Sequence, residues 1–384
     1  MERIWLKSYP AGMPADITWH ENQSVGELFD KSCKQFADRP AFHCMGKTLS
    51  FAQIDKLSRD FAAWVQSKGL PKGSRVAIMM PNCLQYPAVL FGTLRAGYTV
   101  VNVNPLYTAR ELEHQLKDSG AEVIVILENF AHTLEEVLPR TPVKHVVVAS
   151  LGDLLGVKGL IVNFVVRNVK KMVPAFELPN AERFNAVIAE GSGKSMTPFP
   201  TNHDDIAFLQ YTGGTTGVSK GAMLTHRNIL ANIAQASANL VHALHGETPV
   251  IITALPLYHI FSLTVNCLLM AKMGGLNILI TNPRDIPAFV KELAKHKYNM
   301  ITGVNTLFNA FLNNAEFHKL DFSHVKICVG GGMAVQKAVA DRWKQVTGKV
   351  LLEGYGLTET SPCATMNPPS LTDHRGALGP PRPS

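Results

Sequence analysis

The residues with the clearest chemical potential lie in the stretch YTGGTTGVSKGAMLTH, from Tyr211 to His226. Residues 211–220 of this stretch hold three glycines, three threonines, one serine and one lysine. Glycines let backbone N–H groups converge on an anion, hydroxyls add donors, and Lys220 adds a full positive charge. The helix-like run RNILANIAQA follows, so we expect a positive helix end to contribute. These features predict a polyphosphate site; an ordinary surface loop is the simpler alternative.

The spacing of these residues excludes two familiar phosphate loops. A Walker loop requires GxxxxGK[ST], whereas here Ser219 precedes Lys220 and Gly221 follows it. A dinucleotide-binding loop requires GxGxxG, which is absent here, and GYGLTE at 354–359 ends in glutamate instead of glycine. The loop at 211–220 must therefore belong to another class of phosphate site.

A second group of candidate residues lies in EGYGLTETSP, from Glu353 to Pro362, directly after the apolar run KVLL. The Gly–Tyr–Gly turn would expose Tyr355 as a flat face for stacking on a base. Thr358 offers a donor to phosphate, and Glu359 offers a hard oxygen ligand for Mg²⁺. Each residue alone is weak evidence for such a site, since a single glutamate is usually only a surface residue. Together with the first loop they predict a nucleotide site with a magnesium ion.

The elements that must position these residues alternate between strand and helix. The β-branched runs SRVAIMMP, YTVVNVNP, AEVIVI and HVVVAS predict strands, and ARELEHQLKDSG predicts a helix that ends at Gly120. Residues 23–70 are expected to be mostly helical, with Ser24 as an N-cap. Continuous apolar strands separated by helices indicate an α/β fold whose mostly parallel sheets are covered by helices.

The second half of the chain repeats this pattern. We expect strands at IAFLQY, VIITALP, GLNILI, MITGVN, VKICVGGG and KVLLEGYG, and helices near 226–240, 286–296, 306–315 and 335–346. A polar, Pro/Gly-rich stretch near 190–205 separates the halves. The sequence therefore predicts two intertwined α/β subdomains, residues 1–200 and residues 201–384, with the nucleotide motifs in the second.

Composition excludes several classes of protein. The chain has 384 residues, of which 46% are hydrophobic and 17% charged, which is typical of a globular chain and too apolar for a disordered one. The six cysteines are scattered without metal spacing, which favours reduced thiols in the cytoplasm. No secretion signal or membrane span is evident. The net charge of +7 has no nucleic-acid-reading motif beside it, so no nucleic-acid partner is expected.

The stretch VKGLIVNFVVRNVKKMV, residues 157–173, leaves two interpretations open. It combines an apolar helical face with Lys158, Arg167, Lys170 and Lys171. Such a pattern is typical of a helix on a membrane surface. The commoner interpretation is an ordinary amphipathic helix whose apolar face lies on the sheet.

Both motifs carry a family resemblance. YTGGTTGVSKGA and GYGLTET resemble the phosphate-loop and adenylate signatures of the AMP-forming acyl-adenylate superfamily. Four other stretches resemble the bacterial long-chain fatty-acid–CoA ligases of that superfamily: NVNPLYTARELEHQLKDSGA, ALPLYHIFSLTVNCLL, LITNPRDIPAFVKELAK and ITGVNTLFNAFLNN. The similarity runs from about Ile4 to Ser384, which is nearly the whole chain.

The resemblance implies a two-step reaction and a role for each candidate residue. A fatty-acid carboxylate attacks the α-phosphorus of ATP, and the coenzyme A thiol then attacks the acyl-adenylate. Thr358, Glu359 and His259 are implied to be catalytic, with Glu359 on Mg²⁺, Thr358 on the α-phosphate and His259 beside the acyl carboxylate. The less favoured alternative for His259 is a core histidine, and the run after it suits a tunnel wall and a buried helix equally. The residues implied to bind ATP are Thr212, Gly213, Gly214, Thr215, Thr216, Gly217, Val218, Ser219, Lys220, Gly221, Gly331, Gly332, Tyr355 and Gly356.

The chain departs from the family pattern at its end, because it stops at GALGPPRPS without the expected C-terminal domain. We therefore expect these residues to bind ATP and fatty acid but to be weakly active or inactive as a ligase. Two alternatives stay open: another acyl- or aryl-adenylating ligase, or a non-catalytic remnant that binds acyl chains or nucleotide. Peripheral membrane contact and a homodimer are both compatible with the sequence.

Overall fold

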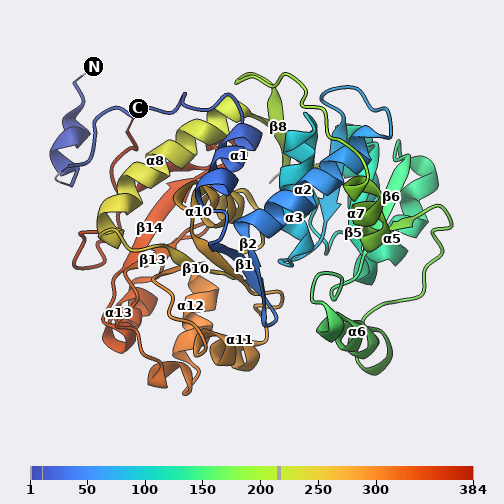
Figure 1. Cartoon of the computed structure of the whole chain (residues 1–384). Coiled ribbons are helices and arrows are strands. Elements are labelled where there is room, and N and C mark those ends of the chain that lie inside the picture. Colours follow the sequence, from blue (N-terminus) through green and yellow to red (C-terminus); the bar gives the residue numbers. More distant parts are fainter. Residues whose placement is uncertain (1, 11, 214–217, 384) are drawn as a thin grey trace. The chain divides into compact units, whose positions relative to one another are not determined.

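The structure is a computed structural model that describes residues 2–10, 12–213 and 218–383. The chain forms two compact units (Figure 1). Unit 2 comprises Gln23–Asp38 and His43–Arg227, and unit 1 comprises the residues before Gln23, Arg39–Phe42 and those from Asn228 onward. The chain finally passes from unit 2 into unit 1 within α8 (His226–Leu244).

Unit 2 is built on a sheet with the strand order β7-β6-β5-β3-β4-β8-β9. Its pairs are parallel except for β8 and β9, which are antiparallel. The strands are β3 (Arg75–Met79), β4 (Thr99–Asn102), β5 (Val123–Leu127), β6 (His145–Ala149), β7 (Glu182–Arg183), β8 (Ile206–Thr212) and β9 (Lys220–Thr225). The sheet core, with Ala77, Val101 and Ile124, is fully buried, as continuous apolar runs predict for parallel strands.

Helices cover the sheet of unit 2. Residues of α4 (Ala109–Ser119) and α5 (Ala131–Val137) pack with the strands in one apolar core, while α2 (Phe51–Gln66) packs against α3 (Gln85–Arg95) and α7 (Phe184–Ser192). The predicted caps are present: Ser24 accepts from Glu27 N at the start of α1 (Val25–Gln35), and Gly120 ends α4 in the left-handed conformation.

Unit 1 is built on a second, mostly parallel sheet that contains the order β15-β14-β13-β12-β10-β11. The strands are β10 (Val250–Thr253), β11 (Leu276–Leu279), β12 (Met300–Gly303), β13 (Ile327–Gly330), β14 (Leu351–Gly356) and β15 (Cys363–Met366). One face packs on α11 (Ile286–Leu293), α12 (Asn305–Leu312) and α13 (Lys337–Thr347). On the other face, Asn266 of the π-helical turn η5 (Leu263–Leu268), which lies between α9 (Ile260–Ser262) and α10 (Leu269–Met273), bonds to Thr253 and Thr302.

The α/β class with mostly parallel, helix-covered sheets is confirmed, and the region 23–70 is mostly helical as predicted, but a short hairpin inside it was not predicted. Between α1 and α2 the chain forms β1 (Pro40–Cys44) and β2 (Lys47–Ser50). Met45 and Gly46 connect them with φ values of 50° and 82°. Two consecutive positive φ angles are typical of a tight hairpin turn, and a methionine in the first of these positions gives little sequence signal for it.

The segment 157–173 differs from the commoner of its two interpretations. It forms α6 (Val157–Phe164) and the π-helical turn η4 (Val165–Val169). The large apolar side chains Val157, Leu160, Ile161 and Phe164 are exposed instead of lying on the sheet. Among the described residues, none of the helices has both the length and the apolar character needed to span a bilayer.

Candidate functional site

The first part of the candidate site is the hairpin of β8 and β9 in unit 2. Thr212 and Lys220 are directly opposed in the antiparallel ladder, so their side chains share a face of the hairpin. Gly213, Val218 and Lys220 are exposed, and Thr212 and Ser219 are half-buried. Gly214, Thr215, Thr216 and Gly217 lie outside the described residues. The ladder thus brings the two ends of the glycine-rich segment together, with a hydroxyl opposite a lysine.

The rear of this hairpin is held by contacts that the sequence did not reveal. Tyr211 and Gly221 are opposed in the ladder, and a Cβ added to Gly221 would lie 2.9 Å from the Tyr211 ring. The Tyr211 hydroxyl donates to Asp118 of α4 at 2.6 Å, and burial together with that carboxylate raises the pKa of Tyr211. His114 of α4 also contacts the carbonyl oxygen of Ser219 at 2.9 Å. A side chain at position 221 would therefore press on the Tyr211 ring, so packing of this ring requires glycine there.

The helix expected after this stretch is present, but its positive end does not lie next to the glycines. Strand β9 intervenes between the loop and α8, which begins only at His226. The run GAMLT alternates in burial, with Leu224 buried and Met223 exposed, and pairs with β8. Since a helix dipole acts only over its first turn, α8 contributes no charge to this loop. The polar groups available there are backbone N–H groups, hydroxyls and the Lys220 ammonium.

The second part of the candidate site lies at the carboxyl ends of parallel strands in unit 1 (β10, β13 and β14 in Figure 1). His259 follows β10, the turn Gly330–Met333 ends β13, and Tyr355 and Gly356 end β14. A Cβ added to Gly331 would lie 3.0 Å from the Phe261 ring and 3.4 Å from the Gly354 carbonyl oxygen. Three segments far apart in the sequence therefore meet at one edge, where open α/β sheets bind ligands.

The Gly–Tyr–Gly motif presents its polar and aromatic groups outward. Tyr355 retains 46% exposure, and Glu359 is exposed in the short turn η7 (Thr358–Thr360). Within the described part of the chain, no hydrogen bond or ion pair engages the Glu359 carboxylate or the Thr358 hydroxyl. These three side chains are therefore free to meet a ligand, and an exposed, unengaged carboxylate is a suitable ligand for Mg²⁺.

Two glycines of this edge are required by the backbone. A Cβ on Gly356 would lie 2.0 Å from the carbonyl oxygen of Pro362, so no other residue fits there without moving the turn. Gly332 has a φ of 74°, in the left-handed region that glycine adopts freely. The neighbouring Glu353 is buried, and its Oε1 accepts from Val335 N at 3.1 Å. It holds the turn after β13, and its other oxygen, Oε2, lies 3.5 Å from His374 Nδ1.

His259 is held in a defined protonation state. Its Nδ1 accepts from the backbone N–H of Phe261 at 3.3 Å, at the start of α9. Burial of the ring lowers the pKa of His259 below its ordinary value, although part of the residue is exposed. A neutral imidazole with Nδ1 as acceptor carries its proton on Nε2, which leaves Nε2–H as a donor.

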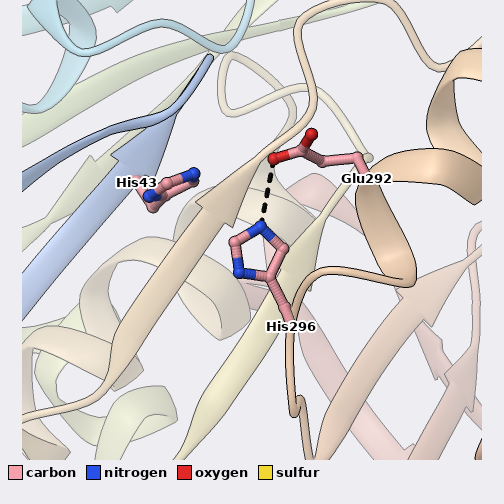
Figure 2. Close-up of side chains that lie close together, drawn as sticks. All are labelled: His43, Glu292 and His296. Carbon is pink, nitrogen blue, oxygen red and sulfur yellow. Dashed lines mark hydrogen bonds and ion pairs between the residues drawn. The ribbon is translucent and has the colours of Figure 1, made fainter.

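One further carboxylate–imidazole pair lies outside the candidate site. Glu292 Oε1 and His296 Nε2 are 3.0 Å apart, one helical turn from each other at the end of α11 (Figure 2). This spacing is the ordinary i,i+4 pairing of a helix end, and Lys295 shares the same carboxylate at 2.6 Å. The pair stabilises the last turn of α11. His43, which the figure also draws, belongs to unit 2.

Comparison with known proteins agrees with this fold and these motifs. Residues 29–384 match the model of a family described as AMP-binding enzymes. The chain is 55% identical to the long-chain-fatty-acid–CoA ligase of Escherichia coli O6:H1 over 386 aligned residues, which cover 100% of this chain and 69% of that protein. It is 34% identical to the Bacillus subtilis enzyme of the same name, with 100% of this chain and 68% of that protein covered.

Solved structures share the fold at low sequence identity. A long-chain-fatty-acid–CoA ligase from Archaeoglobus fulgidus has a TM-score of 0.79 at 23% identity, covering 97% of this chain and 71% of that one. The anthranilate–CoA ligase AuaEII, solved with anthranoyl-AMP, has a TM-score of 0.78 at 19% identity. That match covers 94% of this chain and 64% of the other. At these identities the likeness concerns the fold alone.

Proposed function

This chain belongs to the AMP-binding enzyme family, and from that premise we propose that it activates a long-chain fatty acid with ATP, as a fatty-acid–CoA ligase does. The observation that carries the proposal is the meeting of the His259, Gly331 and Gly354–Gly356 segments at the carboxyl edge of unit 1. An exposed tyrosine ring, a hydroxyl and a carboxylate lie at the end of β14 or directly after it, and His259, whose Nε2 is left as a possible donor, follows β10.

The proposed first step joins the fatty-acid carboxylate to the α-phosphorus of ATP and releases pyrophosphate. A carboxylate is a poor electrophile, and the adenylate gives it a good leaving group for later attack by the coenzyme A thiol. Displacement at phosphorus depends mainly on positioning and on neutralising charge. Tyr355 is proposed to stack on adenine, Thr358 to donate to the α-phosphate, and the Thr212–Lys220 pair to hold the outer phosphates.

Glu359 is the proposed ligand for magnesium. The fit rests on its exposed carboxylate, which no described residue engages, in a turn directly after the proposed base-stacking tyrosine. When bound, Mg²⁺ would neutralise phosphate oxygens. Coenzyme A is the proposed second substrate.

His259 is proposed to orient the acyl carboxylate. Because its Nδ1 accepts from Phe261, its Nε2–H is the group that can donate to a carboxylate oxygen. The lowered pKa of His259 keeps the ring neutral near neutral pH, so that it orients the nucleophile without pairing with its charge. The apolar run after His259 includes buried Leu263 and Cys267 and is the proposed start of the acyl pocket.

The test is fatty-acid-dependent exchange of pyrophosphate into ATP, which follows the first step without coenzyme A. Glu359→Gln removes the charge of the proposed metal ligand at nearly constant volume. Glu316→Gln is the matched control, because Glu316 is also an exposed glutamate of unit 1 and the only described partner of its carboxylate is exposed Lys319. We expect palmitate-dependent exchange that falls by about 100-fold or more in Glu359→Gln and is unchanged in Glu316→Gln.

Equal exchange in both variants would remove Glu359 from the site. Exchange that prefers short or aromatic acids would assign the chain to another adenylating ligase, and nucleotide binding without exchange would favour a binding protein. Formation of acyl-CoA, measured separately, tests the expectation that these 384 residues alone are weakly active. A cytoplasmic location, peripheral contact with the inner face of the membrane and a homodimer stay predictions; contact with a membrane suits a lipid substrate.

A further inference from the structure

Helix α6 and turn η4 present large apolar side chains to solvent. The exposed fractions are 82% for Val157, 73% for Leu160, 64% for Ile161 and 60% for Phe164, and Val169 and Met172 are also exposed. The spacing of 157, 160, 161 and 164 places the first four on one face of the helix. In Figure 1 this helix is drawn in green, with the label α6. A single exposed leucine needs no explanation, but a continuous apolar face does.

The opposite side of α6 is fixed to unit 2, so the helix cannot turn its apolar face inward. Gly159 packs against Gly152 so closely that a Cβ on Gly159 would lie 1.9 Å from the Gly152 carbonyl oxygen. The Asn163 side chain accepts from Gly152 N at 2.8 Å. The polar amide therefore faces the protein while leucine, isoleucine and phenylalanine face outward, the reverse of an ordinary surface helix.

Turn η4 is anchored by charge on the same inner side. Arg167 donates to Glu128 at 2.8 Å and to the Ser150 hydroxyl at 2.8 Å. The Glu128 side chain is only 3% exposed, and Arg167 is therefore committed to holding the segment in place. The pairing with Glu128 also raises the pKa of Arg167, so this anchor stays charged over the working pH range.

The charges of residues 157–172 indicate what kind of surface they would bind. Residues 157–172 contain four basic residues and no acidic residue. Arg167 pairs with Glu128, and Lys158 donates to the carbonyl oxygen of Met45 at 2.6 Å. Lys170 and Lys171 are exposed, and in the described part of the chain no hydrogen bond or ion pair involves their ammonium groups. Two free ammonium groups therefore follow the apolar face, which complements an anionic surface with an apolar interior.

We propose that α6 and η4 form a docking helix that lies in the headgroup region of an anionic lipid bilayer. Val157, Leu160, Ile161 and Phe164 enter the boundary of the acyl chains, and Lys170 and Lys171 pair with lipid phosphates. The choice of a bilayer over a protein partner rests on the charge pattern and on the proposed function, since a long-chain fatty acid partitions into membranes. The docking helix places the enzyme at the bilayer into which its substrate partitions.

The experiment is flotation of the full 384-residue chain with vesicles of phosphatidylcholine containing phosphatidylglycerol, without ATP or fatty acid. Two double variants separate the contribution of the apolar face from that of the lysines. The first is Leu160→Gln with Phe164→Gln, and the second is Lys170→Gln with Lys171→Gln. Leu106→Gln is the control, because Leu106 is 60% exposed in unit 2 on a different segment. All these side chains are exposed, so thermal unfolding is expected to be unchanged and serves to check the fold of each variant.

We expect the chain to float with anionic vesicles, and each double variant to bind about tenfold more weakly, whereas Leu106→Gln binds normally. Added salt should weaken vesicle binding by the intact chain but have little effect on vesicle binding by the lysine variant. Failure of the intact chain to float, or equal flotation of the apolar variant, would overturn the proposal. A dimer of the intact chain that the apolar variant dissociates, with flotation unchanged, would instead assign the face to a second copy and also overturn it. Because the assay contains no substrate, its outcome is independent of whether the ligase proposal holds.

Discussion

His226 is expected to make the stability of unit 2 depend on pH. Its side chain is 2% exposed at the first residue of α8, and its Nδ1 accepts from the backbone N–H of Val25 at 3.1 Å. Burial lowers the pKa of His226 from 6.5 to about 4, and Lys72 adds to the effect against the opposing influence of Asp205. Protonation would also place a hydrogen on Nδ1 and replace this acceptor by a donor facing the Val25 N–H.

The sign and size of the effect follow from this shift. Since the folded pKa lies below the unfolded one, the unfolded state binds more protons between the two values. The contribution of His226 to the free energy of unfolding is therefore fully present above the unfolded pKa and is lost as the pH falls toward the folded pKa. Using the unfolded value of 6.5 and the folded value of about 4, the loss from about pH 7 to about pH 5 is about 2 kcal/mol.

Urea unfolding of the intact chain and of His226→Asn at both pH values provides the assay. Asparagine keeps an acceptor near the position of Nδ1 but does not titrate. The intact chain should lose about 2 kcal/mol more than the variant between the two conditions, with equal dependence on urea. Because each protein is compared with itself at two pH values, any pH-independent effect of the substitution on stability cancels. Equal losses in both proteins would show that His226 is not held neutral by burial, and would refute the reasoning.

Three further predictions concern single residues. Tyr355→Ala should weaken ATP binding by about 5- to 150-fold through lost stacking, whereas Tyr355→Phe should leave it unchanged, as measured by calorimetric titration. Gly356→Ala should abolish pyrophosphate exchange, because its Cβ would meet a backbone oxygen at 2.0 Å, while Gly354→Ala, whose nearest contact is 3.8 Å, should retain most of it. Arg95→Met should lower the free energy of unfolding by about 1.5–3 kcal/mol, because the Arg95 side chain is 1% exposed and its charged hydrogen bonds to Asp30 and Asp55 are lost, while Arg59 still pairs with both carboxylates; a loss near zero in urea unfolding would contradict this.

The sequence predicted the buried strands well because their signal is local. Runs such as VIVIL in β5 are apolar at every position, as burial on both faces of a parallel sheet requires. The carboxyl edge of unit 1 was also predictable in part, since Gly330–Met333 and Gly354–Gly356 follow two such runs. The assignment of roles to these residues stays a prediction.

The errors arose where tertiary contacts decide the structure. The run GAMLT was taken into the loop, because its strand character comes from pairing with β8 and not from its own composition. The outward face of α6 matches only the less common of the two interpretations, because the close contact of Gly159 with Gly152 fixes the orientation of the helix from outside its own sequence pattern. Phe261 against Gly331 has no sequence signal, since the two residues are 70 positions apart in the chain.

In the hairpin of β8 and β9, an insertion in the loop and an insertion in a strand have different effects on the structure. Residues added between Gly213 and Ser219 would lengthen the loop and leave the opposed pair Thr212 and Lys220 in register. A single residue inserted within β9 would instead turn Lys220 to the opposite face, because side chains alternate along a strand. The pairing of β8 with β9 should therefore tolerate changes in loop length, whereas the odd or even count of residues from Lys220 to Leu224 should be preserved.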